Sequence, residues 1–322
     1  MNNIKNKAQL SEEIKTQARN QGFNPIGIAI IPGSDRLTLR TKSLERWLAA
    51  GHQADMNWME APRRQNIESL LKGVKSILAV GLNYYVDKKR DPKALSIARY
   101  AWGRDYHKII EQRLKKIGQW LEKERPSCRW KICVDSAPLL DKAWAEEAGL
   151  GWIGKNSNLI NQKHGSWMAL GHLLCTEPLI PDERTTSLCG ACEICIKACP
   201  TSAITEPFVI DSNQCLAYHT IENRNEALPM EIKQAMGSWV VGCDICQDIC
   251  PWNKQDLVSA KDPDLIPKEW ILTLTKDQVL DWNQETWNQK LKGSALKRIK
   301  PWMWRRNAKA TKLSHSSKIT SN

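Results

Sequence analysis

The sequence has no hydrophobic run long enough to cross a membrane. A helical span needs about 18 or more consecutive apolar residues, whereas this 322-residue chain has a mean hydropathy of −0.48. Residues 1–15 are polar and charged, without the apolar stretch and small-residue cleavage site of a secretory signal. We therefore expect a mature cytoplasmic protein with no membrane partner.

Common nucleotide-binding motifs are also absent. No Gly-x-Gly-x-x-Gly run follows an apolar segment, and the chain has no Walker sequence. The sequence therefore argues against a nicotinamide or flavin cofactor held by a Rossmann unit.

Alternating segments up to about residue 180 predict an α/β layer domain. Apolar runs short enough to be buried strands lie at 25–30, 76–82 and 130–134. The stretch 106–123 carries apolar residues on one face, as an amphipathic helix does. A first helix is expected to begin after an N-capping Ser11 and to end at Gly22. Beyond residue 188 the strand pattern stops.

The eleven cysteines are unevenly placed, and the reducing cytosol argues against disulfides. Eight of them fall between Cys189 and Cys250. The first run, Cys189-Gly-Ala-Cys192-Glu-Ile-Cys195-Ile-Lys-Ala-Cys199-Pro200, has ferredoxin spacing, in which the fourth cysteine binds the other cluster. The second run, Cys243-Asp-Ile-Cys246-Gln-Asp-Ile-Cys250-Pro251, lacks a first cysteine, which Cys215 can supply.

This crossed rule predicts two 4Fe-4S clusters with four thiolates each. One set is Cys189, Cys192, Cys195 and Cys250, and the other is Cys199, Cys215, Cys243 and Cys246. Structural zinc is the alternative, because Cys-x-x-Cys pairs also suit tetrahedral zinc. Zinc ribbons use two separated pairs, so three close cysteines followed by Cys-Pro favour iron and sulfur. Two interlocked clusters would form a short path for electrons.

We predict three parts along the chain. Residues 1–184 form the α/β (α+β) domain, residues 185–260 form a ferredoxin-like domain with two 4Fe-4S clusters, and residues 261–322 form a short basic helical segment with a disordered tail.

The segment 133–158 is the densest in polar residues and glycines. It places Asp135 at the carboxyl end of a predicted strand, before a helix and a glycine-rich loop whose backbone can approach a ligand. From spacing alone, Asp135 is better interpreted as a helix cap, because Ser136 and Pro138 are helix-start signals. The glycines around Trp152 can likewise be a helix stop and a turn.

The net charge of +12 indicates affinity for polyanions. Much of the excess lies within 290–312, where cations alternate with indoles: Lys297, Arg298, Lys300, Arg305, Arg306, Lys309 and Lys312, with Trp302 and Trp304. This composition suits nucleic acid, because cations meet phosphates and indoles stack on bases. A solvated basic tail explains it equally well.

Four stretches resemble the epoxyqueuosine reductase family: 135–158, Ala101-Trp-Gly-Arg-Asp-Tyr-His107, Tyr218-His-Thr-Ile-Glu-Asn223 and Gly242–Asn253. The similarity extends over about residues 11–307, nearly the whole chain. It implies an oxidoreductase that uses cobalamin, as cob(II)alamin, and two 4Fe-4S clusters to reduce epoxyqueuosine to queuosine at the wobble position of tRNA. The α/β domain would hold the cobalamin.

The resemblance also implies roles for individual residues. Asp135 matches the family's proton donor, and in a desolvated pocket its pKa would be raised toward neutrality. Residues that correspond to regions lining cofactor or substrate are Arg64, Asn156, Ser157, Asn158, His219, Thr220 and Glu222. The partners implied are the tRNA anticodon stem-loop and a low-potential electron donor, with the protein acting as a monomer. Longer relatives continue into helical repeats where this chain stops, so its grip on the anticodon stem is open.

Two other functions are compatible with the motifs. A ferredoxin-like electron carrier would have the clusters but no need for the α/β domain or Asp135. A reductive dehalogenase-like corrinoid oxidoreductase would share the layout of cobalamin and clusters, although exported dehalogenases carry a twin-arginine leader that is absent here.

Overall fold

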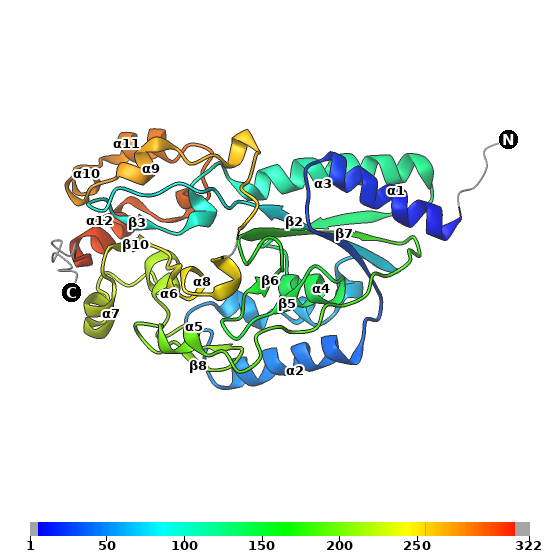
Figure 1. Cartoon of the computed structure of the whole chain (residues 1–322), viewed down its shortest axis with the longest axis horizontal. Coiled ribbons are helices and arrows are strands. Elements are labelled where there is room, and N and C mark those ends of the chain that lie inside the picture. The colour runs from blue at the N-terminus through cyan, green and yellow to red at the C-terminus, as the bar shows by residue number, and fades with distance from the viewer. Residues whose placement is uncertain (1–5, 255, 313–322) are drawn as a thin grey trace.

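The computed structural model describes residues 6–254 and 256–312 (Figure 1). The tail that we predicted to be disordered lies outside the described residues. Within them, no helix has both the length and the apolar character needed to cross a bilayer.

A four-stranded sheet organises the N-terminal part. Its strands are β1 (Ile26–Ile30), β2 (Ser76–Asn83), β7 (Met168–Cys175) and β4 (Trp130–Cys133), in the order β1-β2-β7-β4. Every pair in this sheet is antiparallel. The three strands predicted from apolar runs are therefore confirmed, within a residue or two at their ends. An entirely antiparallel sheet makes this domain α+β, not doubly wound.

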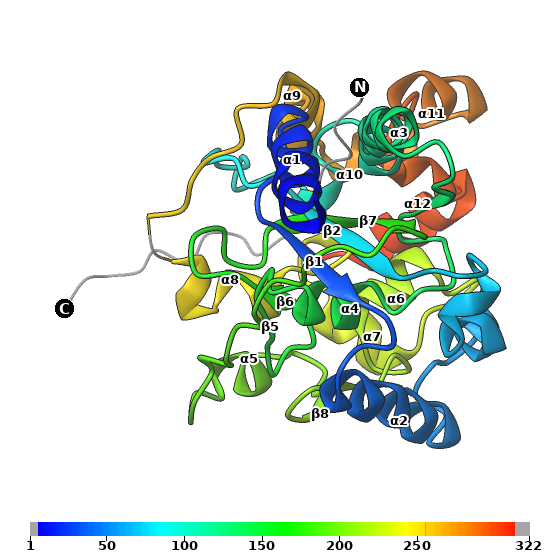
Figure 2. The same ribbon diagram turned by 90° about the vertical axis from the view of Figure 1, so that its right-hand side faces the viewer.

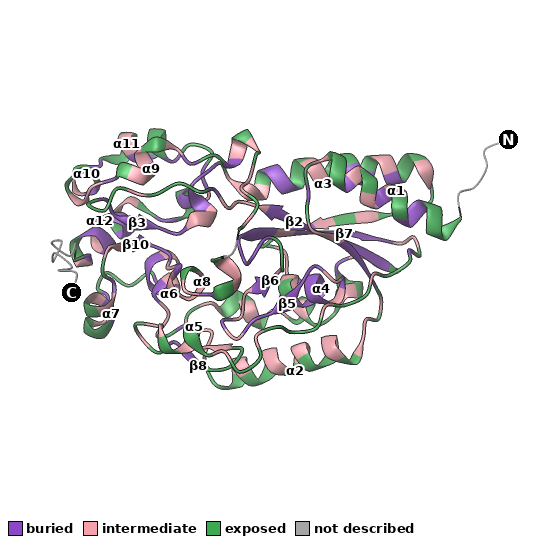
Figure 3. Cartoon of the chain, viewed as in Figure 1, coloured by how far each residue is buried: buried purple, intermediate pink, exposed green. Residues whose placement is uncertain are grey.

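Helices cover both faces of this sheet (Figure 2). On one face lie α1 (Lys7–Asn20) and α3 (Tyr106–Glu124), which share an apolar cluster with the strands. The apolar positions of α3 repeat at helical spacing and are buried, as predicted. On the other face lies α4 (Asp141–Glu147), and α2 (Asp35–Ala49) packs against α4. Figure 3 shows that the strands between these layers are mostly buried.

The predicted start of the first helix is wrong. The helix begins at Lys7, and the side chain of Asn6 caps it by accepting a hydrogen bond from the backbone N of Gln9 at 2.8 Å. Ser11 lies inside the helix, where its hydroxyl donates to the carbonyl of Lys7 at 2.7 Å. Asn caps a helix as well as Ser does, so the earlier residue takes the position. Gly22 follows the helix with φ +82°, as its stop signal predicted.

The cysteine-rich region is built from short elements. They are α5 (Ile194–Lys197), β8 (Ile204–Glu206), β9 (Val209–Ile210), α6 (Leu216–Ile221), α7 (Met230–Ala235), β10 (Trp239–Val241) and α8 (Ile245–Asp248). Two equally short strands, β5 (Trp152–Ile153) and β6 (Leu159–Ile160), pair with each other earlier in the chain, between α4 and β7. The expectation that strands stop after residue 188 is therefore wrong. These strands have two or three residues each, too few for periodicity to reveal.

The last part of the chain completes a second core. Its helices are α9 (Glu269–Thr273), α10 (Lys276–Leu280), α11 (Gln284–Lys290) and α12 (Pro301–Ala310). Their apolar cluster also contains Leu95, Ile97 and Trp102, and β3 (Ser96–Ile97) pairs in parallel with β10. The segment before α3 therefore crosses from the sheet domain to pack with the C-terminal helices. Our three-part division of the chain remains a prediction.

Single turns of 3-10 helix complete the structure. They are η1 (Asn57–Glu60), η2 (Pro62–Arg64), η3 (Ile67–Ser69), η4 (Arg99–Ala101), η5 (Pro251–Asn253), η6 (Pro263–Leu265) and η7 (Ala295–Arg298).

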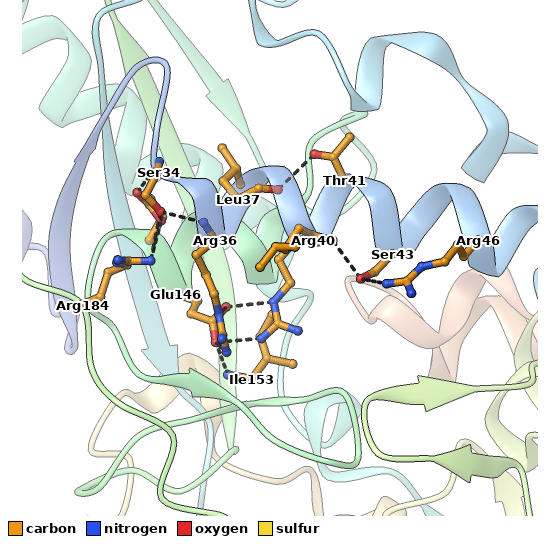
Figure 4. A network of polar contacts seen from close by, with 12 residues as sticks. Ser34, Arg36, Leu37, Arg40, Thr41, Ser43, Arg46, Glu146, Ile153 and Arg184 are labelled. Atoms are coloured by element: carbon orange, nitrogen blue, oxygen red, sulfur yellow. Dashed lines mark hydrogen bonds and ion pairs between the residues drawn. The ribbon is translucent and has the colours of Figure 1, made fainter.

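Glu146 joins three segments of the sheet domain (Figure 4). Its carboxylate accepts two hydrogen bonds of 2.9 Å from Arg40 and two of 3.3 Å from Arg36, both on α2. It also accepts from the backbone N of Ile153 at 3.0 Å, where the glycine-rich loop begins. Burial would raise the pKa of Glu146, but these hydrogen bonds outweigh it and hold the pKa below its usual range. A buried carboxylate thus fixes α2, α4 and the loop to one another.

Glu146→Ala is expected to lower the free energy of unfolding by about 3 kcal/mol, because it strips a buried ion pair of one partner. Arg40, whose side chain is 17% exposed, would keep its charge without a counterion. Urea unfolding followed by circular dichroism measures the loss. Glu45→Ala, an exposed acid on the same helix, should change it by no more than about 0.5 kcal/mol. Equal stability of the two variants would contradict the assignment.

Candidate active site and cluster-binding region

Asp135 lies two residues beyond the end of β4. It has φ +43°, a left-handed conformation that costs free energy for a residue other than glycine. Its Oδ2 accepts hydrogen bonds from the Tyr106 hydroxyl at 3.1 Å and from Nε2 of His107 at 2.9 Å. The next helix, α4, has Leu140 at its N-cap and no side-chain cap. The interpretation of Asp135 as a helix cap is therefore wrong.

The ring of His107 bridges two carboxylates. Its Nδ1 lies 2.7 Å from Oδ1 of Asp105, the residue that caps α3, and its Nε2 lies against Asp135. Burial lowers the pKa of His107, but the carboxylates of Asp105 and Asp135 outweigh burial and raise it to about 9. Both ring nitrogens therefore carry protons at neutral pH.

The expected pKa of Asp135 is wrong in direction. The hydrogen bond from His107 lowers it, and this effect exceeds the rise due to burial. The side chain is 49% exposed, so it faces open space while staying paired with the imidazolium. The available proton lies on His107, next to an Asp135 carboxylate that positions it.

A lysine side chain lies between Asp135 and the cysteines. Lys142 is exposed, yet desolvation by the surrounding protein lowers its pKa. The thiol of Cys246 and the carboxylate of Asp135 have the largest opposing effects, and we call the space among these three side chains the recess. Its Nζ donates to the carbonyl of Ser157 at 2.8 Å. The recess thus has Asp135 and His107, which we call the acid pair, at one side and Cys246 at the other.

The structure brings the cysteines together in two groups. Burial raises the pKa of Cys195, and the thiols of Cys250, Cys189 and Cys192 raise it further. Burial also raises the pKa of Cys243 to about 12, and the thiols of Cys215 and Cys199 contribute to this rise. Burial raises the pKa of Cys246 as well, with contributions from the thiols of Cys243 and Cys215. Each group unites members of both sequence runs, as the crossed rule requires. The thiol of Cys195, a member of the first group, also raises the pKa of Cys246, so the two groups are neighbours.

Within the described ranges, no three His, Cys, Asp or Glu side chains converge closely enough to hold one metal ion. The two ligand sets remain a prediction.

Comparison with known proteins identifies the family. Residues 64–136 match the model described as epoxyqueuosine reductase QueG, DUF1730, and residues 188–253 match a 4Fe-4S double cluster binding domain. An epoxyqueuosine reductase from Synechococcus sp. (strain CC9605) is 62% identical over 302 residues, covering 94% of each chain. The chain belongs to the epoxyqueuosine reductase family.

Solved structures of the family have the same fold. An epoxyqueuosine reductase with an epoxyqueuosine-modified tRNA-Tyr stem loop superposes with a TM-score of 0.85 at 27% identity, covering 94% of this chain and 80% of that one. An epoxyqueuosine reductase from Bacillus subtilis, in which a catalytic aspartate loop is swung out of the active site, gives 0.82 at 26% identity, with the same coverage.

The residues that the family resemblance pointed to differ in their surroundings. Arg64 lies against the segment between β4 and α4, where its guanidinium donates to the carbonyl of Leu139 at 3.2 Å, and Asp141 and Asp135 counteract the lowering of its pKa by burial. Glu222 accepts from Arg298 at 2.7 Å, and both lie near Asp135. Lys142 Nζ donates to the backbone carbonyl of Ser157 at 2.8 Å and to Oδ1 of Asn158 at 3.5 Å, so the loop at 156–158 borders the recess.

His219 and Thr220 have structural contacts instead. His219 is 4% exposed, with Nε2 2.7 Å from the carbonyl of Asn213 and Nδ1 3.0 Å from the amide nitrogen of Asn223. Thr220 is fully buried, and its hydroxyl donates to the carbonyl of Leu216 and accepts from Gly242 N. These bonds occupy their polar atoms, so both shape the backbone around the second cysteine group.

Three side chains of the site received no role from the sequence. Tyr106 and His107 stand in one of the motifs that carried the resemblance, and the signal for them was that motif alone. Lys142 lies in the same stretch as Asp135, seven positions further on, and only the fold shows that it faces the cysteines.

Hydrogen bonds from residues 156–166 help to fasten the cluster region to the sheet domain. Near the recess, Ser157 Oγ donates to the carbonyl of Phe208 at 2.7 Å, and Asn156 Nδ2 donates to the carbonyl of Cys246 at 3.1 Å. Behind it, Asn253 Oδ1 accepts from Ser166 N at 2.8 Å. A Cβ on Gly165 would come within 1.9 Å of that oxygen, so the close approach requires glycine.

Proposed function

We propose that this protein reduces epoxyqueuosine to queuosine at the wobble position of tRNA, using cobalamin and two 4Fe-4S clusters in the cytoplasm. One observation carries the proposal: Asp135, Cys246 and Cys215 all act on the charge of Lys142, and the loop that Lys142 contacts at Ser157 also binds the backbone of Cys246 through Asn156. A source of protons and a source of electrons therefore border one recess. A relative solved with an epoxyqueuosine-modified tRNA stem loop supports this substrate.

The side chains around the recess suit a corrin. Its periphery carries amide groups that both donate and accept hydrogen bonds. Lys142 and Arg64 offer donors, and the carboxylate of Asp141, whose Oδ1 lies 3.3 Å from Nδ1 of His172, is an acceptor that acts on the charge of both. Arg64, Lys142 and the loop at 156–158 are therefore the residues that we expect to hold cobalamin. When bound, cobalamin would supply the strongly reducing cobalt centre for carbon–oxygen cleavage.

The cysteine groups define the route of electrons toward this recess. We assign Cys189, Cys192, Cys195 and Cys250 to the outer cluster, and Cys199, Cys215, Cys243 and Cys246 to the cluster beside Lys142. Asn156 holds the backbone of Cys246 next to the recess. Electrons from a low-potential donor would pass from the outer cluster to the inner one and then to the cofactor site.

The acid pair supplies protons to the leaving oxygen. Reduction of an epoxide to an alkene takes up two electrons and two protons, breaks both carbon–oxygen bonds and releases one water. The first cleavage leaves an alkoxide, which needs a proton at once. His107 holds that proton at Nε2 against Oδ2 of Asp135, and Asp135 faces the open recess. Asp135 therefore takes this proton from His107 and passes it to the oxygen, which leaves His107 neutral.

An anaerobic assay tests the function. Purified protein with cobalamin, a chemical reductant and epoxyqueuosine-containing tRNA should yield queuosine, detected by mass spectrometry of the digested RNA. An electron carrier would take up no corrinoid and would leave the tRNA unchanged. A dehalogenase-like enzyme would bind cobalamin and remove halide from an aryl halide but would not act on the tRNA. Either outcome would refute the proposal.

The pH profile should fall on its alkaline side at about pH 9. His107 has a raised pKa, so the pair holds its proton below that pH and loses it as pH rises through about 9. Asp105→Asn keeps a good cap on α3 but removes one carboxylate, so it should move the fall to lower pH. The measurement is kcat against pH at saturating RNA. A fall at the same pH in both proteins would show that His107 is not the group responsible.

A further inference from the structure

A basic groove lies beside α12, outside the recess. It has a volume of about 510 Å³ and runs between α12 and the segment around α7. Its charged and aromatic lining residues are Glu226, Lys233, Trp302, Arg305, Arg306 and Lys309. Four cations against one carboxylate make it a site for an anion.

The indole of Trp302 is presented as a flat platform in this groove. The Arg306 guanidinium lies 5.3 Å from its ring centroid, and the indole is 37% exposed. Arg306 itself is fixed, because it donates to the carbonyls of His219 at 2.8 Å and Asn223 at 2.9 Å. An indole supported on one side and open to solvent is ready to stack on a planar ring without further ordering.

Positive charge connects the groove to the recess. Arg298 pairs with Glu222 and lies close enough to Asp135 to lower its pKa. Burial raises the pKa of Glu222 and lowers that of Arg306, and the charge of nearby Arg224 opposes the first shift and adds to the second. A chain that leaves the recess past Arg298 therefore finds cations as far as the groove.

We propose that the groove binds single-stranded RNA next to the substrate base, with one base stacked on Trp302 and phosphates held by Lys309, Lys233 and Arg305. This inference rests on the proposed function, which supplies an RNA whose target base is unpaired. Cations with an exposed indole favour RNA over an acidic peptide, because a peptide carboxylate has no flat ring to use the platform. The short C-terminal helix would thus supply RNA contacts directly.

Binding of an anticodon stem-loop RNA with unmodified guanine at the wobble position tests the groove. Measured by fluorescence anisotropy, Trp302→Ala should raise Kd about tenfold, the effect of one lost stacking contact. Trp302→Leu keeps apolar volume without the flat ring and should behave like Trp302→Ala, whereas Trp302→Phe should recover part of the affinity. Lys309→Glu should raise Kd about fivefold and reduce its dependence on salt.

The matched control is Lys123→Glu, which makes the same charge change on an exposed position of α3. Its Kd should stay within about twofold of the parent value. If Trp302→Ala and Lys309→Glu bind like the control, the inference is overturned. It is also overturned if polyglutamate of equal charge competes as well as RNA, which would make the groove a general anion site. The unmodified RNA is not a substrate, so this assay measures binding alone. If the proposed reduction were wrong but the groove were right, the protein would bind RNA normally and form no queuosine.

Discussion

Asp135→Asn is expected to lower turnover of epoxyqueuosine-containing tRNA by about 10²- to 10⁴-fold, the range that one general acid contributes. The amide has nearly the same shape as the carboxylic acid but cannot pass a proton from His107 to the alkoxide. It also removes the charge that helps to hold the pKa of His107 at about 9. The reduction would then have to draw its proton from water.

The experiment has to separate loss of the proton from loss of the site. Single-turnover rates should fall, while cobalamin uptake and the visible absorbance of the clusters stay at the parent level, since Asp135 contacts neither cysteine group directly. Asp277→Asn, at an acid in the first turn of α10, is the matched control and should turn over normally. Parent-like turnover by Asp135→Asn would end the assignment of a proton-transfer role to this carboxylate.

Two double variants are expected to differ in iron content by about four atoms per chain. Under the crossed assignment, Cys195→Ser/Cys250→Ser removes two ligands of the same cluster. The protein should therefore keep the other cluster and hold about four irons instead of about eight. Cys195→Ser/Cys199→Ser removes a ligand from each cluster and should leave almost none. Both proteins lose two thiolates, so the difference comes from which thiolates share a cluster. Both should fail to reduce tRNA, because each breaks the electron route.

Iron and acid-labile sulfide, measured on anaerobically prepared protein, give the counts directly. If clusters were instead formed within each sequence run, the two results would be exchanged, because Cys195 and Cys199 would then share one cluster. Zinc in place of iron in the parent protein would contradict both assignments.

The local patterns that predicted correctly have a common physical basis. The helix α3 buries one stripe of apolar side chains, and a stripe of this kind leaves a 3.6-residue period in the chain. The strands β1 and β2 bury most of their side chains and therefore appear as short apolar runs, and β4 was found by a run of the same kind although only Cys133 in it is buried. The predictions that failed concerned a helix start for which two residues were equally suitable and strands too short to show a pattern. The start of α1 was misplaced because Asn6 and Ser11 are equally good caps, and the strands beyond residue 188 were missed because they are too short.

The cysteine ligand sets could also be proposed from the sequence, since the spacing of cluster ligands is itself a local pattern. The acid pair could not, because Asp135 and His107 lie 28 residues apart and meet only when α3 packs against the end of β4. That meeting reversed the expected direction of the Asp135 pKa and moved the proton to His107. No analysis of Asp135 and its sequence neighbours could have supplied this partner.

The sequence by itself determined the family, the 4Fe-4S double cluster binding domain and the main elements of the sheet domain, because each is encoded by residue type and spacing. Only the tertiary structure decided that Lys142 stands between an acid pair and a cysteine group, that His219 and Thr220 are occupied by backbone contacts, and that Trp302 is presented in a basic groove. These features depend on contacts between segments far apart in the chain. Such contacts arise from packing, which leaves no periodic trace in either segment alone.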